Sequence, residues 1–181
     1  IDRYDQEMIK EIRKTNLCKD KFCSNCKKVK QATRMSRYIP SIESYREYAY
    51  HLVFTIPSVV GENLRSTIDD MNKSFNRLIR YFDGRLKLRG IDFQKYGYLG
   101  AIKSLEITFK GNSYHPHFHV LLVLKSRGEE DSCYVNDYSY STSNGFRKFT
   151  SLEILIQKVW CLLMNNVEVN EKNINDLVQG Y

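Results

Sequence analysis

Hydrophobic and polar residues follow one another along this chain in patterns that predict three strands. Residues 48–56, YAYHLVFTI, are rich in β-branched and aromatic side chains and end at Pro57, which is typical of a buried strand. Residues 98–110 and 114–124 have a similar composition and are separated by a short Gly-Asn-Ser turn. Two such segments joined by a tight turn predict a β-hairpin.

Helical periodicity marks three further segments. Between Gly61 and Gly84 an apolar residue recurs every three or four positions, which predicts a long amphipathic helix. Thr150 and Glu153 form a capping box ahead of a second apolar stripe, so a last helix is expected there. Residues 3–14 have the spacing of a shorter amphipathic helix.

The order strand, helix, strand, strand, helix predicts an α+β fold in which an antiparallel sheet carries helices on one face. A ferredoxin-like or RRM-like sandwich is the leading candidate for this arrangement. Residues 126–149 are polar and are expected to form a long loop. His51, within the first strand, is interpreted as a packed core residue.

The chain is basic, and its charge is concentrated at one end. It carries 28 Lys and Arg against 21 Asp and Glu, a formal net charge of +7, and residues 1–40 hold 11 of the basic residues but only 5 acidic ones. A polyanion such as nucleic acid is the natural partner of such a segment, and a solvated basic surface is the alternative. No apolar run is long enough to span a bilayer, so no membrane partner is expected.

Three of the four histidines alternate along the third strand, at His115, His117 and His119. Alternate residues of a strand project from the same face, so these imidazoles can converge. Glu106 lies in the neighbouring, otherwise apolar strand, where a carboxylate is costly unless it is paired or binds a metal. This combination predicts a site for Mn²⁺ or Mg²⁺, of which Mn²⁺ suits nitrogen ligands better. The alternative is a polar, solvent-facing strand.

Three cysteines lie within nine residues, in the pattern Cys18-x₄-Cys23-x₂-Cys26. Such spacing predicts a structural Zn²⁺ site, which requires four ligands. The fourth ligand stays open between a residue upstream of the chain, Cys133, Cys161 and a histidine. The alternative is a set of unligated thiols. Residues 1–44 are therefore expected to form a basic zinc-binding module.

A run of basic residues follows this cluster and is expected to contact the phosphates of a nucleic acid, with solvated side chains as the alternative. It comprises Lys27, Lys28, Lys30, Arg34 and Arg37.

Four segments in chain order resemble the rolling-circle replication initiators of plasmids, a family of HUH endonucleases. They are CKDKFCSNCKKVKQAT, HLVFTIPSVVGENLRSTIDDMNKSFNRLIR, KSLEITF and YHPHFHVLLVL, which together cover residues 17–125. The resemblance implies that residues 45–181 form an HUH endonuclease domain that is incomplete at its C-terminal end. It also implies a bacterial, cytoplasmic protein that nicks single-stranded or hairpin origin DNA and works with the host replication machinery.

The resemblance assigns roles to individual residues. It implies that Glu106, His117 and His119 hold the divalent ion, with His115 as a further candidate ligand or substrate contact. In the family a tyrosine then attacks the scissile phosphate and forms a phosphotyrosine intermediate, which leaves a 3′-hydroxyl to prime replication.

The sequence departs from the family at the nucleophile. No Glu-x-x-x-Tyr-x-x-Lys motif follows the histidines, and the tyrosines in that part of the chain lack its context: Tyr134, Tyr138, Tyr140 and Tyr181. The catalytic residue is therefore expected beyond the end of this chain.

Two other interpretations remain. An HUH transposase or relaxase would use the same chemistry and would differ in the number of downstream tyrosines. A non-catalytic nucleic-acid-binding module with a zinc knuckle would instead resemble an RRM, whose exposed sheet face carries aromatic residues rather than histidines.

Overall fold

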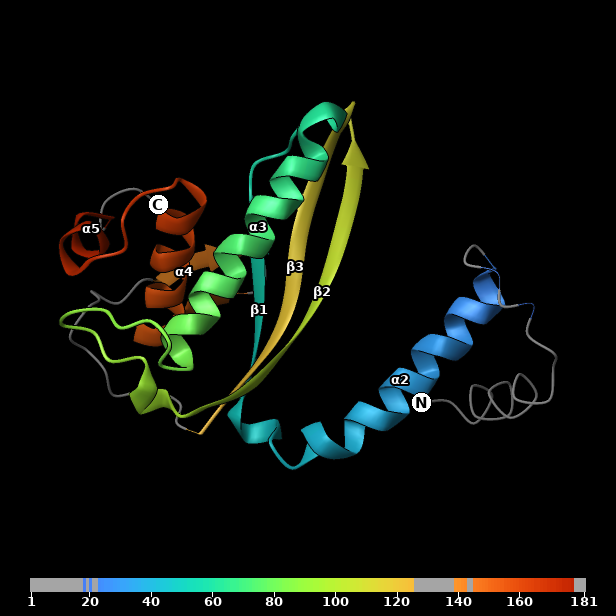
Figure 1. Cartoon of the computed structure of the whole chain (residues 1–181), viewed down its shortest axis with the longest axis horizontal. Coiled ribbons are helices and arrows are strands. Elements are labelled where there is room, and N and C mark those ends of the chain that lie inside the picture. The colour runs from blue at the N-terminus through green and yellow to red at the C-terminus, as the bar shows by residue number, and fades with distance from the viewer. Residues whose placement is uncertain (1–17, 19, 21–22, 126–138, 143–144, 178–181) are drawn as a thin grey trace. The chain divides into compact units, whose positions relative to one another are not determined.

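The computed structural model describes residues 18, 20, 23–125, 139–142 and 145–177 (Figure 1). The chain divides into two compact units, Ile1–Glu47 and Tyr48–Tyr181, and each is described by itself. Within the described residues, no helix is both long enough and apolar enough to cross a membrane.

The described residues of the first unit form the helix α2 (Ser24–Glu43), and a 3₁₀ turn, η1 (Arg46–Tyr48), follows it. Cys23 is the N-cap of α2, and Cys26 in its first turn is buried. The predicted basic run is therefore helical. The helix expected over residues 3–14 lies outside the described residues.

The second unit contains a three-stranded antiparallel sheet in the order β1-β3-β2. Its strands are β1 (Ala49–Thr55), β2 (Tyr98–Lys110) and β3 (Ser113–Leu124). All three predicted strands and the β2–β3 hairpin are confirmed. The turn places Gly111 and Asn112 at positive φ, which glycine and asparagine tolerate best.

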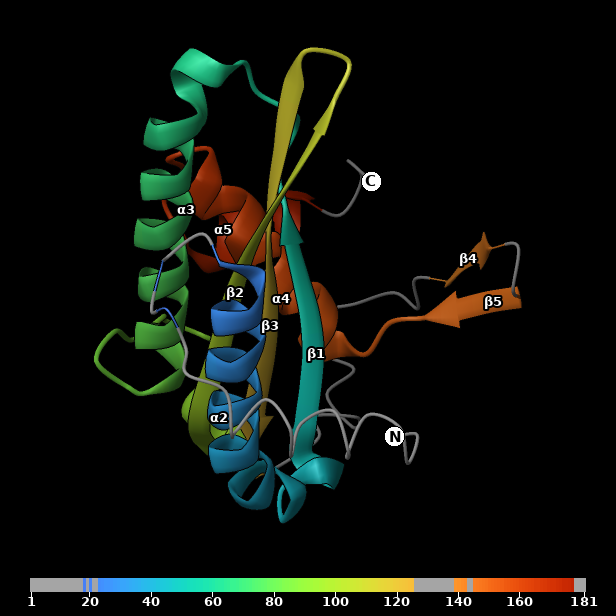
Figure 2. The ribbon, with the colours of Figure 1, turned by 90° about the vertical axis from the view of Figure 1, so that its right-hand side faces the viewer.

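Two helices pack on the same face of this sheet, α3 (Gly61–Phe82) and α4 (Ser151–Met164) (Figure 2). Phe118 of β3 contacts both, since its ring lies 6.0 Å from Phe75 of α3 and 6.5 Å from Trp160 of α4 between ring centroids. The α+β prediction with helices on one face is thus confirmed for this sheet.

The predicted capping box at the start of α4 is present. Thr150 Oγ1 accepts a hydrogen bond from the Glu153 backbone N–H at 3.2 Å, and Glu153 Oε2 accepts one from the Thr150 backbone N–H at 2.8 Å. A short helix that the sequence pattern did not suggest, α5 (Glu171–Asp176), follows after a cap by Asn170. A 3₁₀ turn, η2 (Gln94–Tyr96), precedes β2.

The alternation of β3 determines what lies on each face of the sheet. From Pro116 onward, its even-numbered side chains point into the core between sheet and helices and are buried: Pro116, Phe118, Val120, Leu122 and Leu124. The odd-numbered positions, including the three histidines, belong to the opposite face. There the neighbouring Val53 and Ile102 are 48% and 42% exposed, so this face is open to solvent.

Two predictions made from the sequence are wrong. The segment expected to be a loop contains a two-stranded antiparallel sheet, β4 (Ser139–Thr142) and β5 (Gly145–Lys148). The polar composition of this segment led to the loop prediction. A hairpin stabilised by backbone pairing need not alternate apolar and polar residues, so periodicity does not reveal it. His51 is exposed rather than packed in the core, because Leu52 and Phe54 take the helix-facing positions of β1.

Candidate metal centre

The hairpin brings the predicted acidic residue and the histidines to one place. Glu106 of β2 lies directly opposite His117 of β3, and His119 lies opposite Ser104. Directly opposed residues project from the same face of an antiparallel pair. Glu106, His117 and His119 therefore share the open face, and the tight turn between β2 and β3 fixes this register.

Both imidazoles meet the same carboxylate oxygen. His119 Nε2 lies 2.9 Å and His117 Nε2 3.4 Å from Glu106 Oε2. One ligand atom from each of the three residues lies within 4.8 Å of the other two. The Glu106 side chain is 55% exposed and that of His117 14%, so the cluster is accessible from one side and backed by the sheet on the other. A cation could bind there and keep positions free for water or a phosphate oxygen.

The second nitrogen of each imidazole is also engaged. His117 Nδ1 lies 3.3 Å from the backbone oxygen of His115, and His119 Nδ1 lies 3.4 Å from Nε2 of His51. Histidines that bind metals usually hydrogen-bond through the nitrogen that does not face the ion, which orients the ring. The donor set and its support therefore fit a divalent transition-metal ion.

His115 is not part of the three-residue cluster. Its ring is edge-on to His117 at 5.7 Å between centroids, and its backbone oxygen rather than its ring supports that neighbour. Its Nε2 is buried and has no hydrogen-bond partner among the described residues. The structure thus brings together Glu106, His117 and His119, with His115 beside them.

His51 is a component of this region that the sequence did not reveal. Its ring stacks on His119 with centroids 5.6 Å apart and an interplanar angle of 5°. The two residues are 68 positions apart, and only the β1–β3 pairing makes them neighbours. The only available sequence signal was the odd-numbered position of His51 in a strand whose even-numbered residues are apolar.

The three cysteines form a second cluster in the first unit. One ligand atom from each of Cys18, Cys23 and Cys26 lies within 4.8 Å of the others, and the Cys18 and Cys26 sulfurs are 3.5 Å apart. Hydrogen bonds lower the pKa of the Cys23 thiol, first from the Cys26 backbone and then from the Cys18 and Cys26 side chains. A lowered pKa favours the thiolate, which is the form that binds metal. No disulfide bond joins these three cysteines to one another.

The helix α2 places most of the basic run on one of its faces. Four of its five residues recur at i, i+3, i+7 and i+10 and so lie on one face, whereas Lys28 is rotated about 100° from Lys27. The five side chains are exposed: Lys27, Lys28, Lys30, Arg34 and Arg37. Together the four aligned residues form a positively charged stripe.

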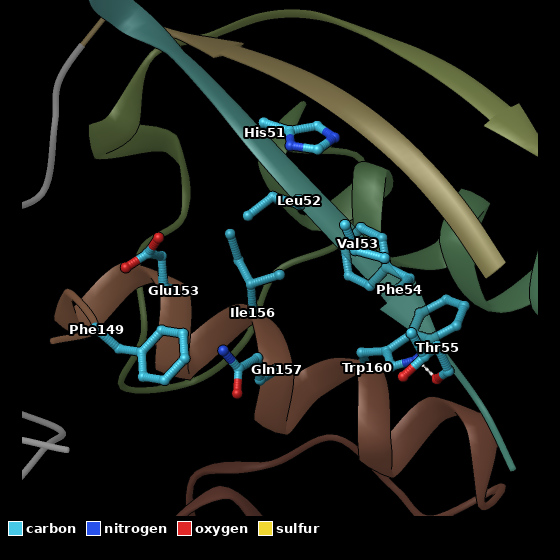
Figure 3. Close-up of a pocket in the computed structure, with 10 residues that line it drawn as sticks. All are labelled: His51, Leu52, Val53, Phe54, Thr55, Phe149, Glu153, Ile156, Gln157 and Trp160. Carbon is cyan, nitrogen blue, oxygen red and sulfur yellow. Dashed lines mark hydrogen bonds between the residues drawn. The ribbon is translucent and has the colours of Figure 1, made fainter. Parts of the chain in front are cut away.

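A cavity of about 500 Å³ lies between β1 and α4 (Figure 3). On one wall, Trp160 Nε1 donates a hydrogen bond to the Thr55 backbone oxygen at 3.1 Å. His51 also lines this cavity, so the cavity adjoins the histidine that supports His119. The remaining lining residues are Leu52, Val53, Phe54, Phe149, Glu153, Ile156 and Gln157.

Some candidates fall outside the described residues. These are Cys133 among the possible zinc ligands and three of the tyrosines considered as nucleophiles, Tyr134, Tyr138 and Tyr181. Tyr140 lies in β4, and Cys161 lies in α4 with a free thiol.

Comparisons with known proteins agree on one family. Residues 9–142 match the family model of the replication protein family Rep_1. A Rep protein of Staphylococcus aureus is 33% identical over 132 residues, which cover 68% of this chain and 52% of that protein. A Rep protein of Streptococcus pneumoniae serotype 2 is 31% identical over 116 residues, 60% of this chain and 33% of the relative. One from Bacillus amyloliquefaciens is 31% identical over 123 residues, 64% of this chain and 33% of the relative.

The chain therefore belongs to the Rep family of plasmid replication proteins. It spans between a third and about half of the length of these three relatives. No solved structure matches it.

Proposed function

We propose that this chain carries the metal-binding part of a replication initiator that nicks single-stranded origin DNA to start rolling-circle replication of a plasmid. The observation that carries the proposal is the convergence of His117 Nε2 and His119 Nε2 on one oxygen of Glu106, on the open face of the sheet. Membership of the Rep family supports a role in replication. The strand order β1-β3-β2 with helices on one face is compatible with an HUH endonuclease fold.

Each residue of the centre has a task in this proposal. Glu106, His117 and His119 would hold Mn²⁺ or Mg²⁺, which would draw charge away from a phosphodiester oxygen. The Glu106 carboxylate supplies the negative charge and the two rings supply neutral nitrogen ligands. The open face gives an extended DNA strand access to the centre. The charged stripe of α2 would contact the phosphates of the origin hairpin. We place the nicking activity in the bacterial cytoplasm.

The nucleophile is assigned to a tyrosine outside the present sequence, because the motif expected around it does not follow the histidines here. The tyrosine would attack the scissile phosphorus, bond to it through its phenolic oxygen and release the 3′-oxygen of the preceding nucleotide. Among the tyrosines of this chain, Tyr134 follows Glu130 by four residues, although Asp137 stands where the family has lysine. Tyr134→Phe is therefore the first substitution to make if this chain proves reactive.

Two measurements on the 181-residue chain test the proposal. One is a calorimetric titration with Mn²⁺, and the other is a denaturing gel after incubation with a single-stranded hairpin DNA and Mn²⁺. Tight Mn²⁺ binding without a covalent band is the expected result. A covalent band lost in Tyr134→Phe would place the nucleophile within this chain and contradict its assignment elsewhere. Absence of both binding and band would overturn the proposal.

A non-catalytic RRM-like module is the main alternative, and the open face argues against it. The positions that β1, β2 and β3 contribute around the centre hold histidines, a carboxylate and aliphatic or hydroxyl side chains rather than phenylalanine or tyrosine. Bases stack on the aromatic residues of RRM sheets, so a face of this kind suits metal-assisted chemistry better.

The cysteine cluster is proposed to hold a structural Zn²⁺, and Cys23→Ser tests this. The substitution is expected to reduce the zinc content from about one ion per chain to nearly none and to unfold the first unit, because zinc binding supplies folding free energy to such small modules. Zinc analysis and the helical circular dichroism signal measure both effects. Ser36→Ala, at an exposed position of the same helix α2, is the control and should retain the ion. An unchanged zinc content in Cys23→Ser would refute the site.

The charged stripe of α2 makes a separate prediction about salt. Lys30→Ala is expected to reduce the slope of log K against log salt concentration by about 0.9, since one duplex phosphate contact is lost, and Lys30→Ala with Arg34→Ala by about 1.8. Binding of hairpin DNA measured by fluorescence anisotropy at several salt concentrations gives the slope. Lys28 was also expected to contact phosphates, but it lies about 100° around α2 from Lys27 and off the stripe, so Lys28→Ala should leave the slope unchanged. Equal slopes for Lys28→Ala and Lys30→Ala would exclude a specific role for the stripe.

A further inference from the structure

The fourth histidine of the chain, His51, contacts a residue of the metal centre but is not one of its three candidate ligands. His51 Nε2 is 3.4 Å from His119 Nδ1, whereas His119 Nε2 is the nitrogen that faces Glu106. Among the described residues, the group whose ligand atoms come within 4.8 Å of one another contains Glu106, His117 and His119 but not His51. His51 thus reaches the centre through His119.

We propose that His51 is a positioning residue that orients the His119 ring for metal binding; this rests on the metal centre of the proposed function. The two imidazole planes differ by only 5° and their centroids are 5.6 Å apart. The rings are therefore nearly parallel as well as in contact through their nitrogens. Val53, the residue of β1 directly opposite His119, lies in the same sheet register. The backbone pairing of β1 with β3 therefore sets the distance at which the two rings meet.

A histidine suits position 51 because its Nε2 can donate a hydrogen bond to His119 when the centre is empty and accept one when a cation is bound. When no cation is bound, a protonated His119 Nε2 can donate to Glu106, and His119 Nδ1 then accepts a hydrogen bond from His51 Nε2–H. With His119 Nε2 as a metal ligand, His119 Nδ1 would carry the ring proton and would donate a hydrogen bond to His51 Nε2. A neutral imidazole meets both demands because either of its nitrogens can carry the proton.

The two ligand histidines differ in how they are supported. The ring of His117 is held by the backbone oxygen of His115, which no side-chain substitution removes. The ring of His119 instead contacts a side chain from another strand, that of His51. The His119 side chain is 37% exposed, against 14% for that of His117. His119 is therefore the ligand whose orientation has the least support from its own strand, and His51 supplies it.

The experiment compares Mn²⁺ affinity by calorimetry in His51→Phe and His51→Gln. Phenylalanine keeps an aromatic ring beside His119 but offers no hydrogen-bonding atom, and we expect its affinity to fall by about 10- to 100-fold, as for other residues that orient metal ligands. Glutamine can donate or accept and should restore most of the loss. Val53→Ala, at a neighbouring exposed position on the same face, is the control and should bind as the original chain does.

The outcomes separate this inference from the proposed function. Mn²⁺ binding by the original chain with an equal affinity in His51→Phe would overturn the role of His51 and leave the metal centre standing. An equally weak affinity in His51→Gln and His51→Phe would also overturn it, because a side chain that can donate or accept a hydrogen bond would then restore nothing. No Mn²⁺ binding by the original chain would overturn both. Thermal unfolding of each variant checks that affinity is compared between folded proteins.

Discussion

Replacing His117 or His119 by alanine is expected to weaken Mn²⁺ binding by more than about 100-fold, while the affinity for single-stranded DNA stays nearly unchanged. Residues that only orient a metal ligand typically contribute 10- to 100-fold to affinity, so the loss of a ligand itself should exceed that range. DNA affinity is carried mainly by contacts between basic side chains and phosphates. The two imidazoles should add little to the DNA affinity. Calorimetry with Mn²⁺ and anisotropy with a labelled oligonucleotide measure the two quantities on the same preparations.

His115→Ala is the matched control for this prediction. It removes the same kind of side chain from the same strand and face, yet leaves the backbone oxygen that accepts the hydrogen bond from His117. Its Mn²⁺ affinity should stay close to that of the original chain. A loss as large as that of His117→Ala would make His115 a ligand. If His117→Ala instead reduced Mn²⁺ and DNA affinity equally, the histidines would contact DNA directly, and the metal centre would lose its support.

Phe118→Ala is expected to produce the largest loss of stability, about 3–5 kcal/mol in the free energy of unfolding. Phe118 is only 1% exposed, and its ring contacts Phe75 and Trp160, so it joins β3 to both helices. The Lys103 ammonium also lies 4.3 Å from the ring centroid. The residue stands between the two histidine ligands, and its removal should therefore also weaken Mn²⁺ binding. Urea unfolding followed by circular dichroism gives the free energy.

Phe109→Ala is the control for this second prediction. Phe109 belongs to β2 of the same sheet but is 62% exposed, so its removal leaves no cavity in the core. Its substitution should change the free energy of unfolding by less than about 1 kcal/mol. Similar losses in the two variants would mean that the core does not centre on Phe118, and the packing described above would be wrong.

Local patterns explain why the strands and the long helices could be predicted. The apolar stripe after Gly61 and the capping box at Thr150 depend on residues within one or two turns of each other. The polar hairpin β4–β5 and the short helix α5 have no such apolar pattern, and their signals are limited to the Asn144-Gly145 dipeptide, which is typical of hairpin turns, and the capping residue Asn170. Both are elements whose backbone pairing or capping, rather than periodicity, defines them.

In the candidate centre, too, some features could be predicted from the local sequence and others could not. The pairing of Glu106 with His117 follows from a hairpin whose turn lies a few residues from both, so strand alternation was enough to predict it. The absence of His115 from the three-residue cluster depends on how the side chains arrange around a single carboxylate, which alternation does not specify. The cysteine cluster was predicted from spacing alone, and the lowered pKa of Cys23 adds a chemical reason why its thiol would bind a metal.

The sequence by itself determined the strand–helix–strand–strand–helix order, the two candidate metal clusters and the family to which the chain is similar, because these depend on residues close together in the chain. Only the tertiary structure decided that β1 pairs with β3 and that His51 therefore meets His119. Residues 68 positions apart become neighbours through the packing of β1 and β3 against a common core. That packing is a property of the whole domain, and no local pattern specifies it.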